Sequence, residues 1–204
     1  MDEVLLYYAG FSVGIFYLLG DIVGGIITPK YNYIKNAVSE LIQSGAEHRP
    51  FLSSFLFLHA VMIILFSVGI LTQHPFEQSK FIFLGGILLL VVGISHALSS
   101  SIFPMDPIDE GRTFPGTLHL ILVGLTVVSI FILMPLLGSG FYLYYGWKSF
   151  VIFTFLCLVI IVISGISSPI VIKRGIEVMG LTERITGYTF YLWLFMMAYL
   201  LINE

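Results

Sequence analysis

Charged side chains are scarce in this chain. They make up 10 % of its 204 residues, against about 25 % in an average soluble domain, while apolar types reach 58 %. The 9 Lys and Arg against 12 Asp and Glu give a net charge of −3, so there is no basic surface for nucleic acid. The one cysteine, Cys157, excludes an intrachain disulfide and any CxxC motif. These shortages exclude a soluble domain, a disordered chain and a nucleic-acid binder, and leave a polytopic membrane protein.

What the chain has instead is long apolar runs. A helix needs about 20 mostly apolar residues to cross a bilayer. Six such runs lie near 4–27, 51–71, 81–103, 116–137, 150–172 and 185–202. They lack the alternation of apolar and polar residues that is typical of barrel strands. The sequence therefore predicts an all-α integral membrane protein, in which residues 1–204 form one domain, a compact bundle of six transmembrane helices.

Lysine and arginine are unevenly distributed between the two ends of the predicted bundle. The loops after the first, third and fifth spans, called here the odd loops, carry Lys30, Lys35, Arg49, Arg112, Lys173, Arg174 and Arg184. The opposite end carries Lys80 and Lys148. Because positive charge collects on the cytoplasmic side, we expect a multi-pass cell-membrane protein with its odd loops in the cytoplasm and both termini outside.

The longest predicted loop, residues 28–50, contains an apolar stripe. Ile34, Val38, Leu41 and Ile42 fall on one face of a helix. Gly45 can end that helix in the left-handed conformation. We expect a short helix here that lies at the membrane interface.

Ionisable residues inside membrane spans are costly and tend to mark function. Asp21, His59, His96 and His119 lie between about 5 and 12 Å deep at about 1.5 Å per residue, all measured from the odd-loop side. A carboxylate at that depth must be protonated or paired. Three partners for it are considered: Arg184, Lys30 or a histidine.

The same residues fit several chemistries. His59, His96 and His119 with a carboxylate are ligand types for zinc, although no HExxH or HxxxH spacing is present. His59 and His96 also lie at similar depths, as the two axial ligands of haem b would. A lipid-headgroup or proton site built from Asp21, Glu40 and the histidines needs neither, so the sequence assigns no cofactor and keeps zinc and haem b as alternatives.

Two local structures are predicted beside the odd loops. Pro104 and Pro107 should end the third span sharply, with Asp106 capping or bracing a neighbouring backbone turn. Thr182 should be the N-cap of the sixth helix, which would leave Glu183 in the first turn and Arg184 free to turn inward.

Three segments, in order, carry a family resemblance. They are Ser39-Glu40-Leu41, Phe103-Pro104-Met105-Asp106-Pro107 followed by His119, and Gly180-Leu181-Thr182-Glu183-Arg184-Ile185 followed by Trp193. This order resembles the prokaryotic membrane family catalogued as domain of unknown function 998, over essentially the whole chain. It is more distantly similar to the eukaryotic Frag–DRAM–Sfk six-span group, which is linked to lipid handling and membrane trafficking.

The resemblance implies the six-span fold but no activity. The positions that match the family are Ser39, Glu40, Pro104, Asp106, His119, Glu183 and Arg184. His59 and His96 are not part of the pattern, which weakens the zinc and haem hypotheses.

The predicted function is the binding of a lipid headgroup or small polar ligand in a polar pocket at one interface. Its candidate residues are Asp21, Ser39, Glu40, Asp106, His119, Glu183 and Arg184. An intramembrane lipid-modifying enzyme, with His119 and either Asp106 or Glu40 as acid–base pair, is the first alternative. A subunit that docks another membrane protein, or a homo-oligomer, is the second. Membrane lipids are expected partners throughout, and nucleic acid is not.

The predicted orientation can be tested by cysteine-accessibility labelling. Cysteine substituted at Glu3 should react from outside intact cells with a membrane-impermeant reagent, whereas cysteine substituted at Gln43 should react only after the membrane is opened. Labelling of the Gln43 site from outside would contradict the orientation but not the number of spans.

Overall fold

The computed structural model describes residues 3–107, 110–173 and 177–204, with side chains described except at residues 3 and 166–173. Its long helices are α1 (Glu3–Ile27), α2 (Arg49–Gln73), α3 (Lys80–Ser101), α4 (Phe114–Tyr145), α5 (Lys148–Lys173) and α6 (Met179–Ile202). A short 3-10 helix, η1 (Val38–Ile42), lies in the first loop. Over the described ranges there are 6 helices long and apolar enough to cross a membrane and no strand, which confirms the predicted all-α fold.

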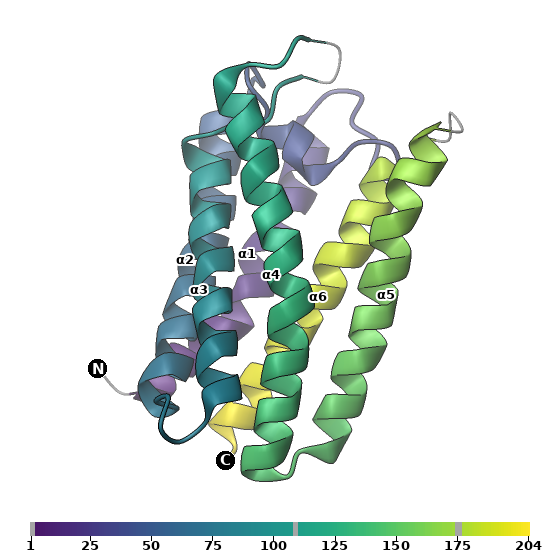
Figure 1. Ribbon diagram of the computed structural model, residues 1–204. Coiled ribbons are helices and arrows are strands. Elements are labelled where there is room, and N and C mark those ends of the chain that lie inside the picture. Colours follow the sequence, from purple (N-terminus) through teal and green to yellow (C-terminus); the bar gives the residue numbers. More distant parts are fainter. Residues whose placement is uncertain (1–2, 108–109, 174–176) are drawn as a thin grey trace.

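The helices form a ring in chain order. Each packs on the next one, and α1 packs on α6 to close the ring. The contact between α4 and α5 is the smallest of these, and Figure 1 shows the two helices diverging towards the end that carries η1. Both termini lie at the opposite end (Figure 1).

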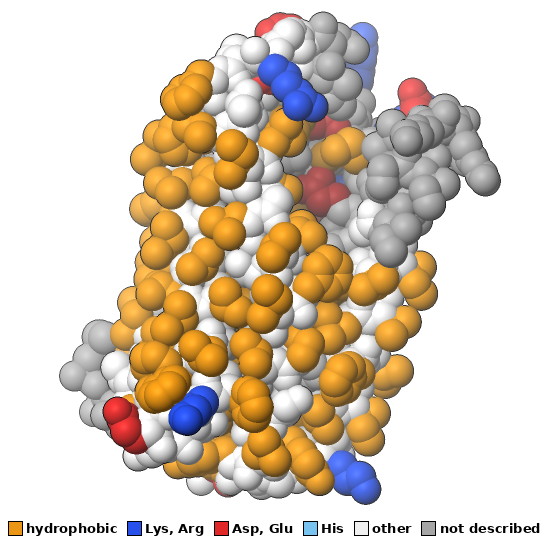
Figure 2. Space-filling view, viewed as in Figure 1, with side chains coloured by type: hydrophobic (Ala, Val, Ile, Leu, Met, Phe, Trp, Pro, Cys, Tyr) orange, Lys and Arg blue, Asp and Glu red, His pale blue; other side chains and the backbone are white. Residues whose placement is uncertain are grey.

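The surface of the bundle is apolar where it would face lipid. Large hydrophobic side chains point outward on all six helices, among them Ile26 (75 % exposed), Leu143 (68 %) and Ile163 (64 %). Figure 2 shows such side chains covering one face of the molecule, with lysine and arginine at its two ends. Polar groups are correspondingly collected inside the ring and in the loops, as expected of a protein whose solvent is hydrocarbon.

Helix α4 is longer than predicted. It continues to Tyr145, past the expected end at Leu137. Gly138 lies in this extension, and a Cβ placed on it would come within 2.9 Å of the Thr154 methyl group of α5. The glycine therefore allows α4 and α5 to approach closely at the end opposite η1.

The first loop differs from the predicted interfacial helix. Val38, Leu41 and Ile42 are at most 3 % exposed, because η1 packs against α1, α2 and α6. Ile34 lies upstream of η1 and is 52 % exposed. Gly45 is left-handed, with φ of 78°, but it follows the end of η1 instead of capping it. The apolar residues of the stripe that fold into η1 thus pack inside the protein.

The start of α6 also differs from the prediction. The helix begins at Met179, and its N-cap is Val178, so the prediction of Thr182 as N-cap is wrong. Thr182 lies within the first turn, where its hydroxyl donates to the Met179 carbonyl at 3.0 Å. The earlier start has a tertiary cause, because the first loop supplies the acceptors that this helix end needs.

Backbone carbonyls of the first loop cap α6. The amides of Gly180 and Leu181 donate to the carbonyls of Lys35 and Ile34, at 3.2 and 3.0 Å. The first amides of a helix have no partner within it, so this contact satisfies two of them. Gly180 has no room for a side chain, since a Cβ there would overlap the carbonyl oxygen of Asn36.

The contact between the first loop and the start of α6 predicts different effects for two glycine-to-alanine changes. Gly180→Ala should lower the melting temperature in detergent by about 3–10 °C, because the loop backbone must move away from α6. Gly124→Ala on α4 meets no atom within 4 Å and should leave the protein equally or slightly more stable, since alanine favours helix. Equal melting temperatures for the two variants would contradict the docking.

Candidate functional site

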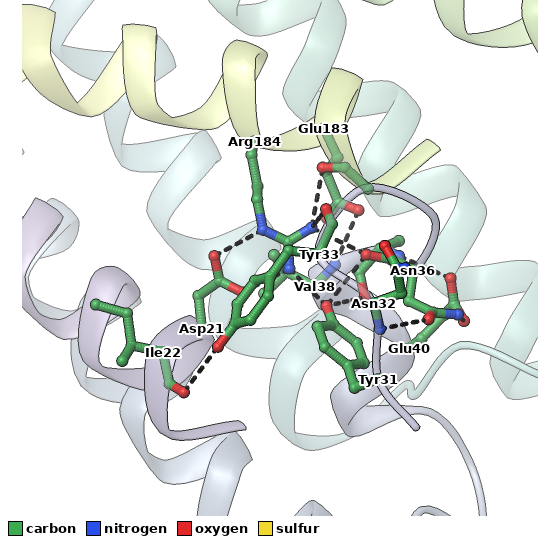
Figure 3. A network of polar contacts seen from close by, with 12 residues as sticks. Asp21, Ile22, Tyr31, Asn32, Tyr33, Asn36, Val38, Glu40, Glu183 and Arg184 are labelled. Atoms are coloured by element: carbon green, nitrogen blue, oxygen red, sulfur yellow. Dashed lines mark hydrogen bonds and ion pairs between the residues drawn. The ribbon is translucent and has the colours of Figure 1, made fainter. Parts of the chain in front are cut away.

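Arg184 and Asp21 form a buried ion pair between α6 and α1. Nε of Arg184 donates to Oδ2 of Asp21 at 2.9 Å, and Nη2 donates to Oδ1 at 2.6 Å. Their side chains are 8 % and 1 % exposed. The Tyr188 hydroxyl donates to the same carboxylate. The prediction that Arg184 turns inward is therefore confirmed, and it is the partner that Asp21 requires (Figure 3).

The other N–H groups of the Arg184 guanidinium hold the first loop. Nη1 lies 2.6 Å from the carbonyl oxygen of Tyr33, 2.9 Å from that of Asn36 and 3.0 Å from that of Gly180. Nη2 also donates to the Tyr31 hydroxyl at 2.6 Å, and burial raises the pKa of that phenol, which keeps it neutral. All five donors of the guanidinium thus have acceptors, and none remains for a ligand (Figure 3).

Two glutamates also form hydrogen bonds that hold the first loop in place. Oε1 of Glu40 accepts from the Ala37 amide at 2.7 Å, and Oε2 accepts from Nδ2 of Asn36 at 2.9 Å. Oε2 of Glu183 accepts from the Val38 amide at 3.1 Å. Glu40 therefore braces its own loop, while Glu183 joins α6 to the start of η1.

Asp106 braces the turn before α4. Its Oδ2 accepts from the Thr113 amide at 2.8 Å and its Oδ1 from the Thr113 hydroxyl at 2.7 Å. These bonds lower the pKa of Asp106. Thr113 is itself the N-cap of α4 and accepts from the Gly116 amide. The predicted bracing role of Asp106 is confirmed.

Three histidines from α2, α3 and α4 follow one another inside the ring. Nδ1 of His59 lies 2.9 Å from the Val13 carbonyl, and its Nε2 lies 3.2 Å from Nδ1 of His96. A carbonyl only accepts, so Nδ1 of His59 donates, and His96 donates to the Nε2 lone pair. Nδ1 of His119 lies 2.9 Å from the Phe103 carbonyl, and His119 and His96 line the same cavity.

The hydrogen bonds of His59 bear on the zinc and haem hypotheses. Both of its ring nitrogens are engaged, so ligation of zinc would cost it one of these bonds. An iron atom between His59 and His96 would require the rings to separate, because they bond each other directly. No group of three or more His, Cys, Asp or Glu placed to hold a metal ion occurs in the described part of the chain. Zinc and haem b remain predictions without structural support.

A cavity of about 740 Å³ lies inside the odd-loop half of the ring. Its lining comes from all six helices and η1, and its size is typical of sites for small ligands, about 300–1,000 Å³. Most of the surface that lines the cavity is apolar. The polar or ionisable side chains at its inner wall include Tyr17, Ser39, His96, His119, Glu183 and Tyr191.

The cavity opens sideways between α4 and α5. Val123 and Val127 of α4 line it and are also 42 % and 44 % exposed, and Gly165 of α5 lines the other side. Figure 2 shows a hollow in the otherwise apolar face, with acidic side-chain atoms inside it. Since α4 and α5 diverge at this end, the opening faces the region where lipid chains would lie.

The structure separates the predicted site residues into two sets. Ser39, His119 and Glu183 line the cavity. Asp21, Glu40, Asp106 and Arg184 do not line it and are used in the hydrogen bonds that hold the loops. Sequence reasoning missed Tyr17 and Tyr191, which line the cavity beside His59 at ring distances of 5.4 and 4.7 Å. Tyrosines in apolar runs carry no signal that distinguishes these two from the lipid-facing ones.

Fold and site together define a multi-pass membrane protein with an internal cavity. Comparison with known families shows that the chain belongs to the family described as protein of unknown function (DUF998), whose model matches residues 12–200. No curated protein and no solved structure matches the chain. The family resemblance of the three sequence segments is thereby confirmed.

The ion pair predicts that lysine cannot replace Arg184. Arg184→Lys should lower the melting temperature in detergent by about 5–15 °C, because one ammonium cannot reach both carboxylate oxygens and the loop carbonyls, and loss of a buried partner costs about 3–5 kcal/mol. Arg184→Gln should lower the melting temperature by at least as much as Arg184→Lys.

Arg49→Lys is the matched control, since Arg49 is only half-buried, has no carboxylate partner among the described residues and donates through Nη2 to the Ser101 carbonyl at 3.2 Å. It should melt within about 2 °C of wild type. Wild-type stability of Arg184→Lys would show that a positive charge alone suffices at this position.

Proposed function

We propose that this protein binds a single-chain amphiphilic lipid, with the head of the lipid in the cavity and its chain in the opening between α4 and α5. The observation that carries the proposal is the form of the cavity, which has polar side chains at its inner wall and a side opening framed by exposed apolar residues. An amphiphile matches both parts, because its head needs hydrogen-bond partners while its chain can stay in hydrocarbon.

The distribution of lysine and arginine indicates from which leaflet the lipid would enter. The cavity lies at the odd-loop end, where most of the lysines and arginines lie. With the odd loops in the cytoplasm, the opening would take lipid from the inner leaflet. The first loop and η1 then close the cavity on the cytoplasmic side.

Lipid modification by an acid–base pair gains no specific support. Asp106 is bonded to Thr113, and Glu40 is bonded to Ala37 and Asn36. Docking of a partner through the outer faces, or self-association, likewise remains a prediction. We therefore put binding first.

Photocrosslinking tests the proposal. Purified protein would be irradiated with single-chain lipids that carry a diazirine in the chain and a glycerol, carboxylate or phosphate head, and labelled peptides would be mapped by mass spectrometry. At least one probe should label the cavity-lining stretches of α4 and α6. Val123→Trp should reduce that labelling at least about fivefold, because indole fills the opening.

The matched control is Leu125→Trp, which places the same side chain on α4 at a residue that is 45 % exposed and does not line the cavity. Its labelling should equal that of wild type. Equal labelling of both variants, or uniform labelling of the outer faces with every probe, would contradict the proposal.

A further inference from the structure

The cavity offers hydrogen-bond acceptors that no described residue uses. Nδ1 of His96 donates to Nε2 of His59, and Nδ1 of His119 donates to the Phe103 carbonyl, so Nε2 of each neutral ring carries a lone pair. Neither atom has a hydrogen-bond partner among the described residues, and both side chains line the cavity. Glu183 adds a carboxylate, which is already partly used because it accepts from the backbone amides of Val38 and Ser39. A ligand head that donates hydrogen bonds would satisfy these groups.

Hydroxyl groups of the lining, among them those of Tyr17 and Tyr191, can supply the complementary donors. Tyr17 and Tyr191 both line the cavity, and their rings pack against each other with centroids 4.6 Å apart. Within the described residues neither phenol has a hydrogen-bond partner, so each can donate to an oxygen of a bound head.

The charge of the lining selects against anions. No lysine or arginine occurs among the described residues that line the cavity, and Glu183 is the acidic one. The nearest guanidinium, Arg184, has all its donors engaged by Asp21 and the first loop. A phosphate or carboxylate head would therefore enter a poorly solvated site beside a carboxylate and without a counter-ion, which is costly.

We infer that the ligand head is an uncharged or cationic hydroxyl- or amine-bearing group, such as an amino alcohol or a diol, and not a phosphate or a carboxylate. This inference rests on the proposed binding of an amphiphile in the cavity. The donors of such a head match the acceptors of His96, His119 and Glu183, while its oxygen accepts from Tyr17 or Tyr191.

Competition between chain-matched lipids tests the inference. Sphingosine, monoolein, oleic acid and oleoyl lysophosphatidic acid would each displace whichever photoreactive probe labels the cavity. Sphingosine and monoolein should compete at concentrations at least about tenfold lower than the two anions, the value of roughly one charge-assisted hydrogen bond. Anions that compete equally well or better would overturn the inference while leaving amphiphile binding in place. If no probe labels the cavity, the proposed function itself fails.

A glutamine substitution separates the head interaction from a structural role. Glu183→Gln keeps the shape and an oxygen for the Val38 amide, but replaces the ionisable carboxyl group with a neutral amide. It should weaken competition by sphingosine about tenfold and strengthen competition by lysophosphatidic acid. Glu177→Gln, which removes a carboxylate paired with Lys35 outside the cavity, should change neither. Equal loss for all four lipids in Glu183→Gln would show a structural role and overturn the inference.

Discussion

The position of one guanidinium constrains most of the odd-loop half of this protein. Arg184 bridges a carboxylate of α1 and the carbonyls of the first loop, and it is the only residue of the described chain that we find bonded to α1, α6 and this loop at once. A charge at this depth is tolerated because every donor is satisfied. The pair thereby fixes the contact that closes the helix ring, and it keeps η1 over the cavity.

The same constraint bears on the ligand that we propose for the cavity. A free arginine at the inner wall would have offered a counter-ion to a phosphate headgroup. Because Arg184 is engaged, Glu183 and the imidazoles of His96 and His119 dominate the polar wall instead. In the proposed account, the structural role falls to Arg184 and the ligand-binding role to the adjacent Glu183, and neighbouring residues on a helix point about 100° apart.

The transmembrane helices could be predicted because they depend on properties of short sequence segments. Each span can be identified from its own run of about 20 mostly apolar residues. The inward turn of Arg184 follows from the need of the buried Asp21 carboxylate for a partner. What failed depended on tertiary contacts. The N-cap assigned to Thr182 was wrong because loop carbonyls cap α6 one turn earlier. The continuation of α4 beyond Leu137 depends on close packing against its neighbours. The roles of Tyr17 and Tyr191 depend on which helices adjoin, and no spacing along one chain encodes that.

The central claim is that the cavity takes a non-anionic lipid through the opening between α4 and α5. Quantitative mass spectrometry of lipids that remain bound after purification in mild detergent tests it most directly. Wild-type protein should retain a hydroxyl- or amine-headed single-chain lipid far above its share in the membrane, and Val123→Trp should lose it. Retention of the bulk phospholipid mixture alone, identical in wild type and Val123→Trp, would contradict the account.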